Sequence, residues 1–129
     1  MTTCGLWLAR RRLVAVLVTE GEARRTIRAA MTDDARYGLL EYLAAAETEI
    51  VTTEALARVD VLPAQAARRG LTVWTADDGL VAALLGAAAI RDPARAAAVL
   101  ARLPRIPLLR ASLRRLTPPC APAHQLPLL

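Results

Sequence analysis

Residues 4–18, CGLWLARRRLVAVLV, decide the fold of this chain, because two apolar runs flank three consecutive arginines. Each run, 4–9 and 13–18, has six residues, which is too short for a free-standing core helix, and the alternating valines of the second favour a pleated strand. Unbroken apolar character indicates that both faces of each strand are covered, as in the middle of a layered α/β sheet. Arg10, Arg11 and Arg12 then mark the exposed turn of a β-hairpin.

The rest of the chain adds strands and helices to this hairpin. Residues 23–31 carry polar side chains on one face, which is typical of an edge strand whose arginines discourage pairing with a second molecule. Further strands are expected at 49–53 and 71–75. Helices are expected at 32–46, within 55–69, at 77–89, at 92–103 and, as an amphipathic piece, at 107–116. The helix at 77–89 is so rich in alanine and leucine that we expect it to be well buried.

The resulting order, β-β-β-α-β-α-β-α-α, predicts an α/β domain with a mixed five-stranded sheet and helices on its faces. With 129 residues, one domain over 1–116 is the simplest division. Residues 117–129, TPPCAPAHQLPLL, contain four prolines and hold no regular helix. We expect 117–124 to be an extended, largely disordered linker that leads to a peptide at 125–129.

Charge is unevenly distributed along the chain. Every one of the 17 basic side chains is an arginine, and the net charge is +5. Residues 1–90 are close to neutral, whereas 91–129 hold seven arginines and a single acid, Asp92. Such a basic segment favours an acidic partner, nucleic acid first and an acidic protein surface second, although a solvated helix face would have the same composition.

The two cysteines, Cys4 and Cys120, lack the spacing of a metal or redox site and fit a reducing cytosol. The N-terminus has no charged segment before its apolar run, and no apolar run approaches the roughly 18 residues that span a bilayer. We therefore expect a cytoplasmic protein that does not contact a membrane.

The predicted strand order resembles that of the RNase H-like superfamily. More narrowly, residues 3–103 resemble the RuvC-like DEDD domain of Piv-type DNA invertases and insertion-sequence transposases. Those domains open with a GIDxxK strand, place a glutamate after the fourth strand and begin a late helix near TDxxDA. Their carboxylates hold two divalent metal ions, which activate the attacking oxygen and stabilise the leaving one.

The resemblance implies that the catalytic positions are degenerate here. Gly5-Leu6-Trp7 lies where Gly-Ile-Asp would, so Trp7 replaces the first aspartate, and Arg95 replaces the fourth carboxylate. Glu54 and Asp92 fall on the second and third positions. Both also have ordinary interpretations, Asp92 as a helix cap and Glu54 as a strand-end acid. We favour no catalytic residue and no cofactor; the alternative is a Mg²⁺- or Mn²⁺-dependent nuclease or recombinase that uses Glu54, Asp92 and Asp77 or Asp78.

Other catalytic schemes lack their residues. The single histidine, His124, lies in the proline-rich segment, and the sequence has no glycine-rich phosphate loop and no paired-cysteine site. Asp33, Asp34, Asp77 and Asp78 are expected as helix-start acids.

The C-terminal peptide resembles the bacterial sliding-clamp-binding motif Q-L-[SDP]-L-[FL]. It is formed by Gln125, Leu126, Pro127, Leu128 and Leu129. Such a peptide offers an amide for hydrogen bonding and aliphatic side chains for a hydrophobic pocket, while the proline lowers the entropy lost on binding. An ordinary tail that packs on its own domain is the alternative.

Together these features predict a non-catalytic accessory protein of DNA replication or repair, translesion synthesis included, that docks on the sliding clamp. Its domain would contact DNA phosphates, without reading sequence, or a repair partner. The candidate residues for that contact are Arg10, Arg11, Arg12, Arg110, Arg114 and Arg115. Two alternatives stay open: a DEDD-type nuclease acting on branched DNA, and a protein-interaction module that binds no nucleic acid.

Overall fold

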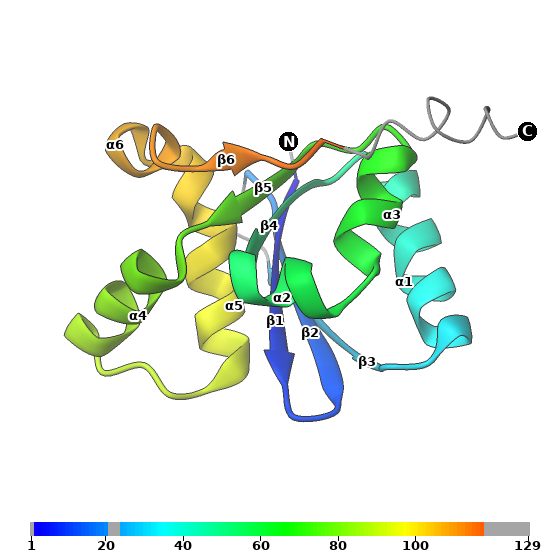
Figure 1. Ribbon diagram of the computed structural model, residues 1–129, viewed down its shortest axis with the longest axis horizontal. Coiled ribbons are helices and arrows are strands. Elements are labelled where there is room, and N and C mark those ends of the chain that lie inside the picture. The colour runs from blue at the N-terminus through cyan, green and yellow to red at the C-terminus, as the bar shows by residue number, and fades with distance from the viewer. Residues whose placement is uncertain (1, 21–23, 118–129) are drawn as a thin grey trace, which may run out of the picture.

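The expected hairpin is the centre of the structure, a computed structural model that describes residues 2–20 and 24–117 (Figure 1). Strand β1 (Thr3–Ala9) pairs antiparallel with β2 (Arg12–Val18), from Thr3 opposite Val18 to Ala9 opposite Arg12. The turn holds only Arg10 and Arg11, because Arg12 already belongs to β2. Arg10 adopts a left-handed conformation with φ of 56°.

The hairpin lies inside a mixed sheet with the strand order β3-β2-β1-β4-β5-β6. Strand β3 (Arg24–Ala30) pairs antiparallel with β2 and is an edge strand, as predicted. Strands β4 (Glu49–Thr53) and β5 (Val73–Ala76) continue the sheet on the other side of β1, and both pairings are parallel. The sheet therefore combines an antiparallel half with a parallel half.

A sixth strand corrects the five-stranded prediction. Strand β6 (Arg114–Arg115) pairs antiparallel with β5, and the Leu116 backbone N–H donates to the Val73 carbonyl oxygen at 2.8 Å. The helix expected over 107–116 is correspondingly wrong beyond its first turn, since α6 ends at Arg110. The leucine spacing suits a helix, but an extended chain satisfies backbone groups of β5 that would otherwise lie at an open edge.

Helices cover both faces of this sheet (Figure 1). Their bounds are α1 Asp33–Ala45, α2 Glu54–Val59, α3 Leu62–Arg68, α4 Asp78–Ala87, α5 Pro93–Arg102 and α6 Pro107–Arg110, with a 3₁₀ turn at Leu103–Arg105. Helix α2 begins directly after β4, where a loop was expected, because the Thr53 hydroxyl accepts from the Leu56 N–H at 3.1 Å and caps it. No helix in the described ranges is long and apolar enough to cross a membrane.

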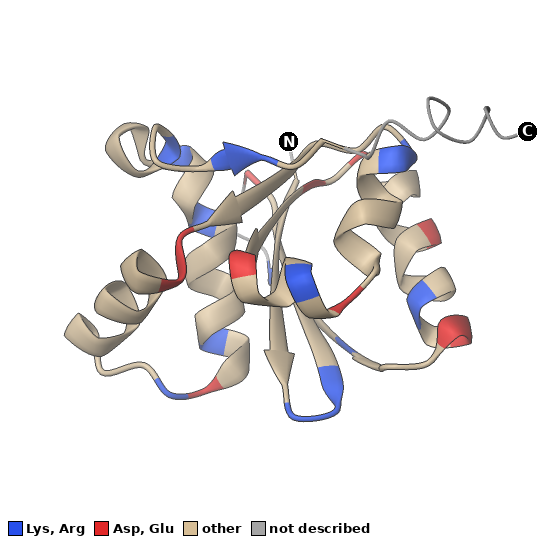
Figure 2. Cartoon of the chain, in the orientation of Figure 1, with Lys and Arg blue, Asp and Glu red and all other residues tan. Residues whose placement is uncertain are grey.

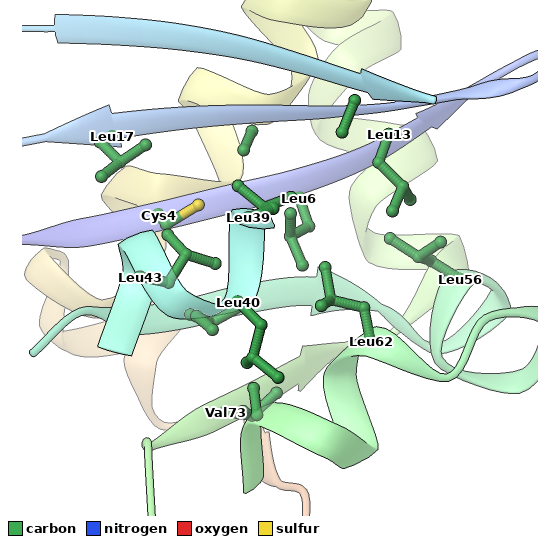
Figure 3. Packing of buried hydrophobic residues seen from close by; sticks show 14 of the residues in the cluster. Cys4, Leu6, Leu13, Leu17, Leu39, Leu40, Leu43, Leu56, Leu62 and Val73 are labelled. Carbon is green, nitrogen blue, oxygen red and sulfur yellow. The ribbon is translucent and has the colours of Figure 1, made fainter. Parts of the chain in front are cut away.

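One face of the sheet packs on α1 and α3 and forms the larger core (Figure 3). Side chains from β1, β2 and β4 meet leucines of α1 there, and Leu6, Leu13, Leu43 and Ile50 are fully buried. Cys4 lies in the same cluster, and burial raises the pKa of its thiol to about 12. The prediction that the hairpin is covered on both faces is confirmed.

The other face packs on α5. The valines of β2, Val14, Val16 and Val18, contact Ala97, Ala98 and Ala101 of the helix. Gly5 lets the helix approach closely, because a Cβ at this position would overlap the Ala97 carbonyl oxygen and lie 2.9 Å from the Ala101 backbone nitrogen. The Thr3 hydroxyl also donates to the Ala101 carbonyl oxygen at 2.8 Å. Backbone contact therefore holds α5 against β1.

Helix α4 does not meet the expectation of deep burial. Val81 is its only buried residue, while Leu80, Leu84 and Leu85 are half-buried. The apolar composition of this helix predicted burial on all sides, but only one side of the helix packs on the rest of the domain.

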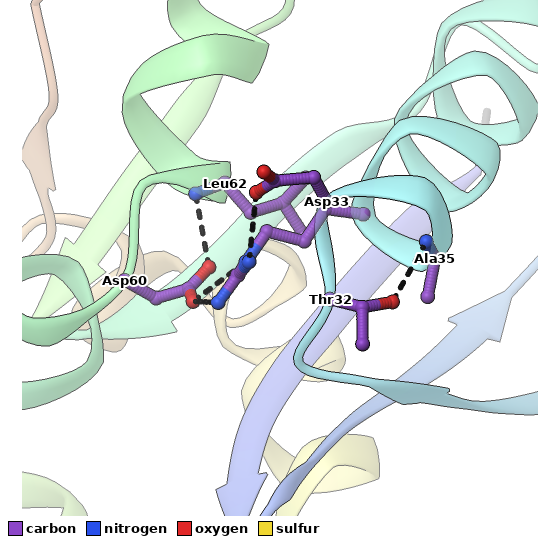
Figure 4. Close-up of polar contacts among 6 residues, drawn as sticks. Thr32, Asp33, Ala35, Asp60 and Leu62 are labelled. Carbon is purple, nitrogen blue, oxygen red and sulfur yellow. Dashed lines mark hydrogen bonds and ion pairs between the residues drawn. The ribbon is translucent and has the colours of Figure 1, made fainter.

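A buried ion pair joins α1 to the segment between α2 and α3 (Figure 4). The Asp60 side chain is fully buried, and its Oδ1 accepts from Arg36 Nε at 2.9 Å and lies 2.8 Å from Nη2. Its Oδ2 accepts from the Leu62 N–H at 3.0 Å. Because each carboxylate oxygen has a partner, the buried charge is compensated.

Candidate functional site

An apolar groove lies at the carboxyl ends of β4 and β5, where α2 and α4 begin. In open α/β sheets this edge is the usual place for a site. The groove has a volume of about 500 Å³. It is lined by Trp7, Leu8, Thr53, Ala55, Leu56, Val59, Asp78, Val81 and Ala82. Trp7, at the position of the first carboxylate in the resemblance, thus presents an indole to this groove.

Asp78 is the acid of the groove, and its carboxylate already has partners. Its Oδ1 accepts from the Ala55 N–H at 3.1 Å, and its Oδ2 lies 3.2 Å from Arg58 Nη2. The neighbouring Asp77 accepts from the Leu80 N–H at 2.9 Å as the N-cap of α4. The interpretation of both aspartates as helix-start acids is confirmed. These contacts tie α4 to α2 across the groove.

Glu54 and Asp92 lie outside the groove lining. Glu54 is the first residue of α2, so it follows β4 directly rather than ending it. Asp92 is exposed and caps α5, with its Oδ2 accepting from the Arg95 N–H at 3.0 Å. The predicted helix cap is confirmed, and Arg95 is the residue whose backbone it caps.

The donor set here does not fit a two-metal centre. Trp7 offers no oxygen ligand, and the carboxylates of Asp78 and Asp92 hold backbone N–H groups of helices. Within residues 2–20 and 24–117, no three acidic, histidine or cysteine side chains gather closely enough to hold a metal ion.

The candidate arginines fall into two groups at opposite ends of the molecule (Figure 2). The β1–β2 turn and the start of β2 carry Arg10, Arg11 and Arg12, whereas α6 and β6 carry the remaining three. All six are exposed. The two groups do not form one continuous patch, because the turn lies at the end of the β1–β2 hairpin, whereas β6 lies beside β5 at the edge of the sheet (Figure 1).

Arg110 differs from the other five in that its guanidinium has partners among the described residues. Its Nη1 donates to the Pro104 carbonyl oxygen at 3.1 Å and lies 3.7 Å from Glu49 Oε1. Its guanidinium also stacks over the Trp74 ring, with 5.2 Å between the Cζ and the ring centroid. These contacts fasten α6 to the sheet and engage the positive charge.

The C-terminal candidates, Gln125, Leu126, Pro127, Leu128 and Leu129, lie outside the described residues, as do Cys120 and His124. Their assignment as a clamp-binding peptide stays a prediction. Neither a scan of the chain against models of protein families nor a search of the curated proteins finds a match.

Proposed function

We propose that this chain is a non-catalytic accessory protein of DNA replication or repair, acting in the cytoplasm, with a degenerate RNase H-like domain. In this proposal residues 125–129 dock on the bacterial sliding clamp and the domain contacts DNA phosphates. The strand order β3-β2-β1-β4-β5 supports the domain assignment, since β2 is antiparallel and β4 and β5 are on the parallel side of β1.

The observation that carries the non-catalytic assignment is the occupation of the candidate catalytic positions. Trp7 lines an apolar groove where the resemblance implies a carboxylate. The Asp92 carboxylate caps the N-terminus of α5 by accepting a hydrogen bond from a backbone N–H. Arg95 stands at the fourth position and is exposed. An indole and a guanidinium are poor ligands for Mg²⁺, which prefers oxygen.

Clamp docking is tested by a pull-down of purified sliding clamp with the full chain and two variants. The double substitution Leu128→Ala/Leu129→Ala removes the aliphatic side chains that would enter the clamp pocket, and we expect it to abolish capture. Leu108→Ala is the matched control, because Leu108 is an exposed leucine of α6 at 87% exposure. Capture that survives the double substitution would remove the proposal.

The two alternatives have distinct outcomes. Mg²⁺- or Mn²⁺-dependent cleavage of branched DNA that is lost in Glu54→Ala would establish the nuclease. Clamp capture combined with no DNA binding at any salt concentration would establish a protein-interaction module.

A further inference from the structure

Among residues 2–20 and 24–117, no helix covers one face of the edge strand β3. Helix α5 packs on β1 and β2, but on the same side of the sheet Arg24, Thr26, Arg28 and Ala30 are exposed. The opposite face of β3 turns toward α1, where Ala29 is buried and Ile27 packs on the core. The uncovered face therefore presents only arginine, threonine and alanine to solvent.

The strand register fixes the direction of these arginines. Arg28 is paired with Val14 and Arg24 with Val18, and both valines pack on α5. Since residues directly opposite each other in a sheet point to the same face, both arginines share the face of α5. Arg12 also points there, because side chains on one face of a strand recur at every second position and Val14 follows two residues later.

A fourth arginine comes from α5 itself. Ala94 and Ala98 face the valines of β2, whereas Leu100 faces the cluster under α4. At 100° per residue, Arg95 lies about 60° from Ala98 and about 140° from Leu100, hence on the flank of α5 nearer to β2 and β3. Arg95 is exposed. We call Arg12, Arg24, Arg28 and Arg95 the arginine strip.

The charges of the arginine strip are uncompensated in the part of the chain that the structure describes. Other arginines have carboxylate partners there, such as Arg36 with Asp60 and Arg69 with Glu41 at 2.6 Å. No ion pair or hydrogen bond joins the guanidinium group of any member of the strip to residues 2–20 or 24–117; Arg95 takes part in the Asp92 cap only through its backbone N–H. Four like charges on one uncovered surface favour an anionic partner.

We propose that the arginine strip binds the sugar–phosphate backbone of DNA. The inference rests on the proposed function, because it takes DNA as the partner of the domain, and it specifies a face that excludes β6. Arg24 and Arg28 are four residues apart on a strand, about 13 Å, so each can contact a different phosphate of one backbone. Guanidinium groups suit this role because they bind phosphate oxygens in a bidentate manner.

The composition of the strip disfavours the other anionic partners. A protein interface needs a buried aromatic or aliphatic anchor at its centre, and a lipid surface is held best when apolar side chains insert as well. The strip has neither kind of side chain. A second copy of the chain is also disfavoured at this edge, because two β3 strands would bring their arginines together.

The test is fluorescence anisotropy of a labelled DNA duplex titrated with the full chain over a range of salt concentrations. Arg24→Gln/Arg28→Gln removes two charges from the strip. Arg25→Gln/Arg68→Gln is the matched control, because it removes two exposed arginines from the opposite side of the sheet: Arg25 is paired with Leu17, which faces α1, and Arg68 ends α3. Arg12→Gln/Arg95→Gln is a second strip variant on other elements, and it decides the question if the first does not fold.

We expect either strip variant to weaken DNA binding about tenfold and to reduce the slope of log K against log [salt] by about two, one for each lost phosphate contact. The control should leave that slope close to its original value. A control that weakens binding as much as the strip variants would overturn the strip while the DNA contact stands. If the unaltered chain binds no DNA, both the arginine strip and the DNA contact of the proposed function are overturned. Clamp docking, the other part of the proposed function, is tested independently by the pull-down. Binding to anionic phosphatidylserine vesicles that depends on the strip, without binding to DNA, would also overturn the proposal that the strip binds DNA.

Discussion

Gly5→Ala is the most direct test of how α5 sits on the sheet. A methyl group on residue 5 would overlap the Ala97 carbonyl oxygen and lie 2.8 Å from the Ala97 carbonyl carbon, whereas ordinary contact begins at 3.4 Å. These atoms belong to the helix backbone and cannot turn aside as a side chain would. Because the overlap with the carbonyl oxygen is the tighter of the two, helix α5 must move away from β1 by more than about one ångström.

The energetic cost follows from what that movement separates. Overpacking a well-packed core costs typically about 1–3 kcal/mol. The shift also lengthens the hydrogen bond from the Thr3 hydroxyl to the Ala101 carbonyl oxygen, now 2.8 Å, and such a bond contributes about 1 kcal/mol. We expect Gly5→Ala to lower the free energy of unfolding by about 3 kcal/mol, a large part of the total for a domain of this size.

Urea denaturation followed by circular dichroism measures this change, with Gly38→Ala as the control. Gly38 lies inside α1, and apart from its chain neighbours and the helix's own backbone, no described atom lies within 4 Å of the position of an added Cβ. The same substitution there should raise the free energy of unfolding by about 0.5–1 kcal/mol, because alanine favours the helix. A Gly5→Ala protein within about 0.5 kcal/mol of the original would refute the close approach of α5.

Three further changes test other parts of the structure. Burial raises the pKa of the Cys4 thiol from 9.0 to about 12, so the unfolded chain loses the thiol proton at a lower pH than the folded chain does. The free energy of unfolding should therefore be constant below pH 9 and fall as the pH rises toward 12, by about 1 kcal/mol at pH 10. Denaturation of the Cys4→Ala variant should lack this contribution to the loss of stability between pH 9 and 12. Asp92→Ala should cost about 1 kcal/mol in a thermal melt and Asp92→Asn much less, since asparagine also caps helices; equal losses would contradict the capping role. Thr52 is fully buried in β4, and its hydroxyl has no hydrogen-bond partner among the described residues. Thr52→Val should therefore raise the free energy of unfolding by about 1 kcal/mol in the same urea denaturation. A lower free energy of unfolding would show that the hydroxyl makes a hydrogen bond.

Features that depend on neighbouring residues were predictable from the sequence. The hairpin at 4–18, strand 49–53 and the cap at Asp92 follow from short patterns, and the structure confirms them. Strand β6 was missed because its partner, β5, is about forty residues earlier, and nothing in the local pattern of Arg114 and Arg115 indicates that edge. The exposure of α4 was missed for a related reason: the apolar composition of a helix does not indicate how many of its faces are covered by neighbouring elements.

The candidate site shows the same division. The lack of a carboxylate at Trp7 and the capping role of Asp92 could be inferred position by position. The engagement of Arg110 with Trp74 and Glu49 could not, because it depends on the packing of α6 on the sheet. The shared face of Arg24 and Arg28 with α5 needed the register between β2 and β3.

The contact between β1 and α5 also sets the order in which a growing chain can acquire its structure. Thr3 meets Ala101, a separation of 98 residues, so the valine face of β2 has no cover until α5 has left the ribosome. At roughly 5–20 residues per second, that face stays open for several seconds or more of synthesis. Released fragments that end before Pro93 should therefore require a chaperone to remain dispersed, whereas fragments that extend past Arg105 should not.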